Sequence, residues 1–185
     1  MKKQFIGLIA VLVLILVVVS TFILYNEWPF MTGNKLVLAT LPVDPFDPFR
    51  GQYMAINYEI SAVDNTVDNI NGSFEEGDTI YVVLKEDEQG IWRRDSTSKS
   101  KPLEGDFIRG EVINVNGDSL RVEYGVEQFF FERNAKLPTT NITVEVTVAN
   151  SGRAKLVQLL YNGKPVEIEY EPFDIKSKAF TSPYS

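Results

Sequence analysis

One uncharged apolar segment near the N-terminus constrains this chain more than any other feature. From Phe5 to Tyr25 the sequence is FIGLIAVLVLILVVVSTFILY, in which Ser20 and Thr21 are the only hydroxyl-bearing interruptions before the final tyrosine. A helix rises about 1.5 Å per residue, so this segment is long enough to cross the roughly 30 Å of hydrocarbon in a bilayer. The sequence therefore predicts a cytoplasmic stub and a transmembrane anchor within residues 1–28.

The residues that flank the apolar segment predict its orientation. Lys2 and Lys3 precede it, and the positive end of a membrane helix stays in the cytoplasm. The rest of the chain is then expected outside the cell membrane. A cleaved signal peptide is the alternative, because Val18 and Ser20 could occupy the small-residue positions before a cleavage site. The apolar run is longer than a usual signal core, which favours an uncleaved anchor.

Composition excludes several classes of function. The net charge is -7, or -9 without Lys2 and Lys3, and an acidic domain is unsuited to nucleic acid. The chain contains no histidine and no cysteine, which removes histidine-based and thiol catalysis and thiolate metal sites. No catalytic residue, metal site or cofactor is predicted, and no nucleic acid is expected as a partner.

Beyond the anchor the apolar residues alternate with polar ones, as in half-buried strands. Asn116-Gly117 and Asn162-Gly163 each separate two alternating runs and favour tight hairpins, because both residue types tolerate positive φ. We expect an all-β exterior domain at 29–173, an antiparallel barrel or sandwich, followed by a polar tail at 174–185. The other predicted strands are Lys35–Leu41, Gln52–Ser61, Thr79–Lys85, Gly90–Ser96, Asp106–Val115 and Val126–Arg133, and Val63–Gly77 is predicted to be a polar loop.

A proline-spaced stretch precedes the second of these strands. Pro42, Pro45 and Pro48 recur at every third position, which matches the polyproline II helix with its about three residues per turn. One stripe of such a helix would carry acidic side chains, and Gly51 then allows a bend into the strand. In that strand Met54, Ile56, Tyr58 and Ile60 share the face expected in the core. The candidate binding surface is the polar remainder: Asp44, Asp47, Arg50, Tyr53, Asn57 and Glu59.

The strand also resembles a family signature. Gly51, Tyr53, Ile56 and Tyr58 are similar to the pattern of the GDYXXLXY domain family, with Gln52 in place of aspartate and Ile56 in place of leucine. The lead-in PVDPFDPFR and the later segment YGVEQFFFE, residues 124–132, resemble the same family. The resemblance implies a membrane-anchored domain whose partner is an integral-membrane protein, and it implies no catalytic role.

Glu127 is the carboxylate that the alternation places beside aromatic residues, because it shares a strand face with Phe129 and Phe131. A buried carboxylate needs a partner, and Arg50 is predicted to form a structural ion pair with it. The competing hypothesis is a hydrolase acting on cell-envelope material through two carboxylates. Its candidates are Asp44, Asp47, Glu59 and Glu127. A third possibility is a groove that receives an extended peptide along a sheet edge.

The sequence thus favours a single-pass membrane protein whose exterior β domain acts by binding an integral-membrane partner. The lipid bilayer is the second expected partner, through the N-terminal helix.

Overall fold

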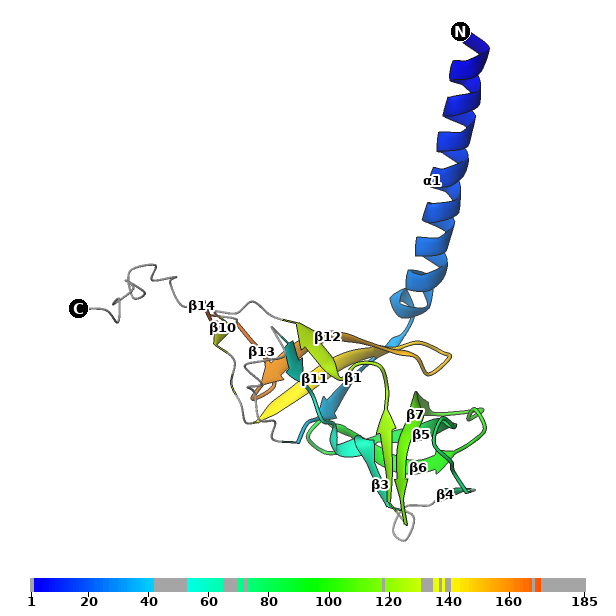
Figure 1. Ribbon diagram of the computed structural model, residues 1–185. Helices are drawn as coiled ribbons and strands as arrows, with labels where there is room; N and C mark the ends of the chain where they lie inside the picture. The colour runs from blue at the N-terminus through cyan, green and yellow to red at the C-terminus, as the bar shows by residue number, and fades with distance from the viewer. Residues whose placement is uncertain are drawn as a thin grey trace, which may run out of the picture.

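A computed structural model describes residues 2–41, 53–64, 70–71, 73–117, 119–130, 135–136, 138, 141–167 and 169–170. Within them a long helix, α1 (Lys2–Met31), stands away from a β domain, as Figure 1 shows. The stretch Phe5–Met31 has 27 residues, and its most apolar part is not buried against the domain. The helix therefore has the length and composition to span a bilayer, and it extends three residues past the predicted end at residue 28.

Among the described residues the main sheet contains ten strands. Nine follow one continuous order, β13-β12-β11-β1-β6-β5-β7-β8-β3, and β4 pairs with β6 beside this path. The bounds are β1 Asn34–Ala39, β3 Ala62–Asp64, β4 Ile70–Asn71, β5 Thr79–Glu86, β6 Trp92–Ser98, β7 Asp106–Asn116, β8 Ser119–Glu123, β11 Ile142–Val148, β12 Ala154–Tyr161 and β13 Lys164–Pro165.

The sheet is open and mixed. Of the predicted antiparallel barrel or sandwich, barrel closure and purely antiparallel pairing are therefore wrong, while the mostly β domain after one N-terminal helix is confirmed. Strand β1 pairs antiparallel with β11 but parallel with β6, where Leu38 lies opposite Trp92. Strand β4 is also parallel to β6. Hairpin turns specify antiparallel neighbours, whereas no local turn specifies where β1, arriving from the helix, joins the sheet.

Two predicted segments are organised differently from the expectation. The single strand expected at Gln52–Ser61 is interrupted: β2 (Tyr53–Ala55) ends early, and a 3-10 turn, η1 (Glu59–Ser61), leads into β3. The polar loop expected at Val63–Gly77 begins inside β3 and includes β4. Strand β2 pairs with β9 (Gln128–Phe130), and β10 (Ala135–Lys136) pairs with β14 (Glu169–Tyr170), each as a separate two-stranded sheet.

Both predicted hairpins are confirmed. Strands β7 and β8 meet at Asn116 and Ser119, with Gly117 at φ 59° between them. Strands β12 and β13 meet at Tyr161 and Lys164, with Asn162 at φ 50° and Gly163 at φ 76°. Both residues of the second turn have the positive φ that a two-residue hairpin requires, which explains why Asn-Gly occurs there.

One core joins the two ends of the sheet. Leu36 and Leu38 on β1, Val144 and Val146 on β11, and Val82 on β5 belong to the same buried cluster. The predicted core face of the interrupted strand is confirmed where its side chains are described, because Ile56, Tyr58 and Ile60 are all buried. The predicted alternation of buried side chains is therefore confirmed even where the strand is interrupted.

Candidate functional site

The two segments that resemble the family signature lie against each other in the fold. Strand β2 pairs antiparallel with β9, so Met54 lies opposite Phe129 and Ala55 opposite Gln128. One step further along, the backbone N–H of Ile56 donates to the carbonyl of Glu127 at 2.6 Å. The backbone hydrogen bonding between these two segments, which are far apart in sequence, thus extends beyond the two strands.

Two buried tyrosines hold the two segments together, each through a hydrogen bond to the other segment. The Tyr58 hydroxyl donates to the Val126 carbonyl at 2.7 Å, and the Tyr124 hydroxyl donates to the Ile60 carbonyl at 2.7 Å. Each tyrosine therefore reaches from its own segment into the other. We call these two bonds the tyrosine clasp. Its members occupy the last tyrosine of the signature strand and the first residue of the YGVE segment.

Burial raises the pKa of both clasp tyrosines. Loss of solvation is the largest cause at Tyr58, and the nearby Glu127 charge raises its pKa further. At Tyr124 burial also raises the pKa, while Arg94 opposes and Glu127 reinforces that direction. Both phenols stay protonated, so each can donate its hydrogen bond. The clasp is a structural device rather than an acid or base.

Glu127 closes the turn that carries the clasp. Its Oε1 accepts a hydrogen bond from the backbone N–H of Tyr124, three residues earlier, and its side chain is half-buried. The predicted partner, Arg50, lies outside the described residues, so the ion pair stays a prediction. Phe129 packs against the core as expected, whereas Phe130 is exposed.

A surface hollow of about 350 Å³ lies beside the clasp. Leu41, Tyr58 and Leu120 are apolar lining residues, and polar side chains from Asn57, η1, β7 and β8 surround them. Arg121 donates from Nη2 to the Asn57 Oδ1 at 3.2 Å across this wall. The remaining lining residues are Ser61, Ala62, Asn114, Asn116 and Ser119. We call this feature the Asn57 hollow.

The Asn57 hollow is rich in hydrogen-bond donors. Arg121 is the one charged side chain among its described lining residues, and three asparagines add amide groups that both donate and accept. The Ser61 hydroxyl is buried and has no hydrogen-bond partner among the residues that the structure describes. Such an arrangement suits a ligand that presents carbonyl or carboxylate oxygens.

The Glu59 side chain forms an ion pair with Arg93 and does not line the Asn57 hollow. Arg93 donates from Nη1 to Glu59 at 2.5 Å and from Nε to Asp87 at 2.8 Å. Asp87 also accepts from the backbone N–H groups of Gln89 and Ile91, which closes the β5–β6 hairpin. The side chain of Glu59 is engaged in an ion pair instead of lining a cavity.

Replacing Asp87 with asparagine is expected to destabilise the protein more near neutral pH than in acid. The backbone N–H of Ile91 and the Arg93 guanidinium hold the Asp87 pKa below its ordinary value of 3.8. The carboxylate therefore stabilises the folded state above pH 3.8, and this contribution is lost as the pH falls through the folded-state pKa. Urea unfolding of the parent and of Asp87→Asn at about pH 6 and about pH 3 measures the difference; equal differences would contradict the assignment.

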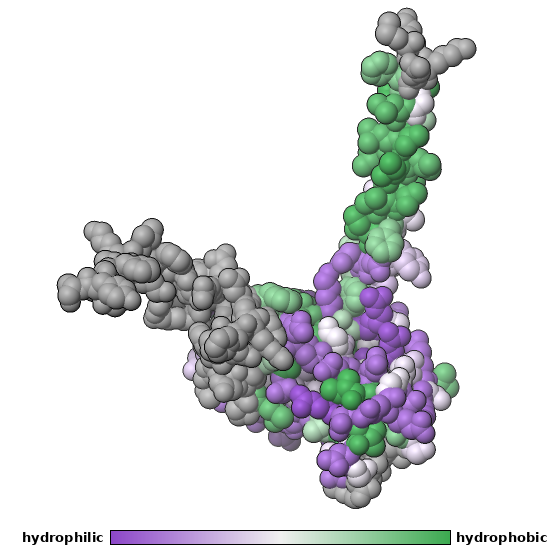
Figure 2. Space-filling view, viewed as in Figure 1, coloured by the Kyte–Doolittle hydropathy of each residue, from purple (hydrophilic) through white to green (hydrophobic). Residues whose placement is uncertain are grey.

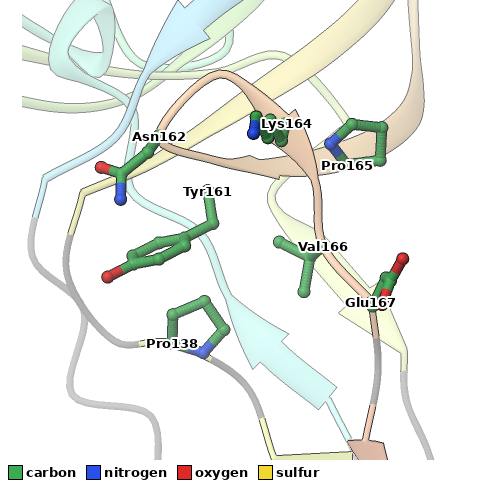
Figure 3. Close-up of a pocket in the computed structure, with 7 residues that line it drawn as sticks. All are labelled: Pro138, Tyr161, Asn162, Lys164, Pro165, Val166 and Glu167. Carbon is green, nitrogen blue, oxygen red and sulfur yellow. The ribbon is translucent and has the colours of Figure 1, made fainter.

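A second hollow, of about 880 Å³, lies at the β12–β13 hairpin. Figure 3 shows the Tyr161 ring, Pro138 and Val166 around the same open space, with Lys164 and Glu167 near its edge. None of the predicted site residues lines it. Its two charged lining residues, Lys164 and Glu167, have opposite charge, and Glu167 is the one carboxylate among the described residues that line it.

The structure describes only part of the predicted binding surface. Asp44, Asp47 and Arg50 lie outside the described residues, and Tyr53 is placed by its backbone in β2. Asn57 lines a hollow, and Glu59 pairs with Arg93. Sequence reasoning missed Arg121, Asn114 and Asn116, although the Asn116-Gly117 turn was the available signal that these residues lie together at one hairpin end.

The structure describes two of the four carboxylates of the hydrolase hypothesis, Glu59 and Glu127. Glu59 and Glu127 are engaged by separate partners, the Arg93 guanidinium and the Tyr124 amide. Across the described part of the chain, no three acidic side chains converge as a metal ion would require. The terminal strands of the sheet, β13 and β3, have two and three residues. Strand β13 pairs only with Leu160 and Tyr161 of the longer β12, so the peptide-groove hypothesis stays a hypothesis.

Comparison with known proteins adds one result. Neither the curated proteins nor the solved structures include a match to the chain. The family model described as GDYXXLXY protein matches residues 15–159, which includes the second half of α1, both segments of the tyrosine clasp and the sheet through most of β12. The chain therefore belongs to the GDYXXLXY family.

Proposed function

We propose that this protein is a single-pass membrane protein whose exterior β domain binds an integral-membrane protein through the Asn57 hollow. The observation that carries the proposal is the position of a donor-rich hollow on a domain joined almost directly to a membrane-spanning helix. The family match begins at residue 15, so it includes the second half of this helix together with the domain.

The link between helix and domain is short and tightly packed. Only Thr32 and Gly33 separate α1 from β1, and the Gly33 N–H bonds back to the Phe30 carbonyl at 3.4 Å. A side chain at Gly33 would come within 2.6 Å of the Val148 carbonyl oxygen. Such a link leaves little freedom for the domain to move away from the bilayer, which supports a partner in the same membrane.

Retention of the helix is part of the proposal. The apolar helix continues well beyond Val18 and Ser20, the positions that a signal cleavage would use, and its last turns contact the domain. Lys155 pairs with Glu27 at 2.5 Å, which ties β12 to the end of α1. With Lys2 and Lys3 in the cytoplasm, the domain lies outside.

Photocrosslinking in intact membranes tests the partner. A photoreactive amino acid at position 57 is expected to capture an integral-membrane protein, because Asn57 lines the hollow. The matched control is position 157, since Val157 is exposed and lines none of the described hollows, whereas Asn57 is half-buried in the wall of one. Arg121→Ala should reduce the adduct from position 57. Capture of no membrane protein from position 57, or equal capture from position 157, would overturn the proposal.

Thiol labelling tests the anchor and its orientation. The chain has no cysteine, so Ser151→Cys introduces a unique thiol in an exposed turn. A membrane-impermeant maleimide is expected to label this variant in intact cells, and the labelled chain should remain in the membrane fraction at full length. Recovery of a soluble, shortened chain would show that the helix had been removed.

A further inference from the structure

The turn between β11 and β12 lies against the end of the membrane helix. Arg153 and Lys155 both lie over the Phe30 ring, with the charged groups 5.6 Å and 5.7 Å from its centroid. Lys155 also pairs with Glu27 at 2.5 Å. Two basic side chains therefore flank the last turn of α1.

Two more basic residues reach the same turn from β7 and the loop before it. The Arg109 N–H donates to the Gly152 carbonyl at 2.8 Å, so β7 lies alongside the turn. Gly152 is so close to Phe107 that an added Cβ would come within 2.9 Å of the ring. Lys101 lies over that ring at 5.8 Å. We call these four residues the basic collar: Lys101, Arg109, Arg153 and Lys155.

The length of the helix sets the depth of the basic collar. The 27 residues of Phe5–Met31 span about 40 Å, whereas bilayer hydrocarbon is about 30 Å thick. The last turns, which contain Glu27 and Phe30, therefore lie at the level of the lipid headgroups. Tyr25 and Trp28 are strongly exposed there, as aromatic residues at an interface usually are. Figure 2 shows the apolar surface of α1 giving way to hydrophilic residues at its base.

Acidic neighbours offset part of this charge. Glu27 is engaged by Lys155, and Asp106 accepts a hydrogen bond from the Asn34 amide at 2.7 Å. Glu104 is a third carboxylate, in the loop that carries Lys101. Four basic residues thus meet three carboxylates among these described residues, in an exterior chain whose overall charge is -9 once Lys2 and Lys3 are set aside. A charge distribution of this kind attracts an anionic membrane surface at the collar and repels it elsewhere, which fixes how the domain faces the bilayer.

We propose that the basic collar binds the phosphate groups of anionic phospholipids in the leaflet from which the end of α1 emerges. The proposal rests on retention of the helix, which is part of the proposed function. Lipid is the source of the phosphate because the collar lies at headgroup depth, where anionic lipid is far more concentrated than free anions. The bound headgroups hold the domain in one orientation, with the Asn57 hollow at a fixed position relative to the membrane.

Fluorescence quenching in vesicles tests the basic collar on the full-length protein. The Ser151→Cys variant is labelled with an environment-sensitive dye and inserted into vesicles that contain a headgroup-labelled quencher lipid. Quenching is expected to be stronger in phosphatidylcholine vesicles with added phosphatidylglycerol than in phosphatidylcholine alone, and to decrease as sodium chloride is added.

Neutralising collar residues should release the domain from anionic vesicles. Arg153→Gln is expected to weaken the lipid-bound orientation about fivefold, and Arg109→Gln combined with Arg153→Gln roughly 25-fold, from the typical contribution of a basic residue at a membrane surface. The matched control is Lys164→Gln, which removes one positive charge from the exposed β12–β13 hairpin and should change nothing.

Three outcomes would overturn the proposal. They are equal quenching with and without phosphatidylglycerol, an equal loss in Lys164→Gln, and release by inorganic phosphate beyond that by chloride at the same ionic strength, which indicates a site for free phosphate. The vesicle experiment uses the intact chain, so removal of the helix in cells would defeat the proposed function without changing this result. Conversely, if the basic collar does not bind lipid, crosslinking from position 57 to an integral-membrane protein is still expected.

Discussion

Replacing Tyr58 with alanine is expected to lower the free energy of unfolding by about 5 kcal/mol, because both its ring and its hydroxyl are used inside the domain. The side chain is completely buried in the core, so truncation leaves a large cavity. The hydroxyl bond to the Val126 carbonyl is also lost, which leaves that acceptor unsatisfied. Domains of this size are stable by about 5–15 kcal/mol, so the change removes much of the total.

Tyr58→Phe separates the two contributions. It keeps the ring and removes the hydroxyl, so it should cost about 1–2 kcal/mol. Urea unfolding of the full chain in detergent micelles, followed by near-ultraviolet circular dichroism, measures both variants. An unchanged unfolding midpoint for Tyr58→Ala would show that the tyrosine clasp does not hold the two signature segments together.

The second large effect is expected from Gly110→Ala, at about 3 kcal/mol of destabilisation. Gly110 lies in β7 and has no positive φ, so alanine suits its backbone and the effect is purely steric. An added Cβ would come within 2.5 Å of a Val122 methyl group, 2.8 Å of the Glu123 carbonyl oxygen and 2.9 Å of the Tyr124 ring. The backbone oxygen cannot move without disturbing the strand that leads into the clasp.

Glu111→Ala is the matched control for this position. Glu111 is the next residue of β7 and is exposed, so its replacement should change the free energy of unfolding by less than about 0.5 kcal/mol. The two variants are compared by the same urea unfolding measurement. Equal midpoints for Gly110→Ala and Glu111→Ala would mean that β8 and Tyr124 approach β7 less closely than the structure shows.

The structure gives the family signature a physical meaning. Ile56 and Tyr58 are core residues, and Tyr124 and Val126 complete the contacts that Tyr58 and Ile60 begin. The signature residues therefore hold together two segments that are distant in sequence. Binding is proposed for the side chains that surround this clasp, because the tyrosines themselves are buried and fully used.

The sequence by itself determined the features that depend on neighbouring residues. The uncharged run of α1, the Asn116-Gly117 and Asn162-Gly163 hairpins, and the buried face of Ile56, Tyr58 and Ile60 all follow from hydrophobic period and turn chemistry. Each of these patterns is contained in one short stretch of chain.

Only the tertiary structure decided how those stretches meet. The insertion of β1 between β11 and β6, the break of the expected strand at η1 and the placement of Arg121 beside Asn57 join residues that are far apart in sequence. The basic collar likewise assembles from a loop, a turn and two strands, next to the end of a helix. Local propensity carries no information on such pairings, because their free energy comes from burying one set of surfaces against another across the whole domain.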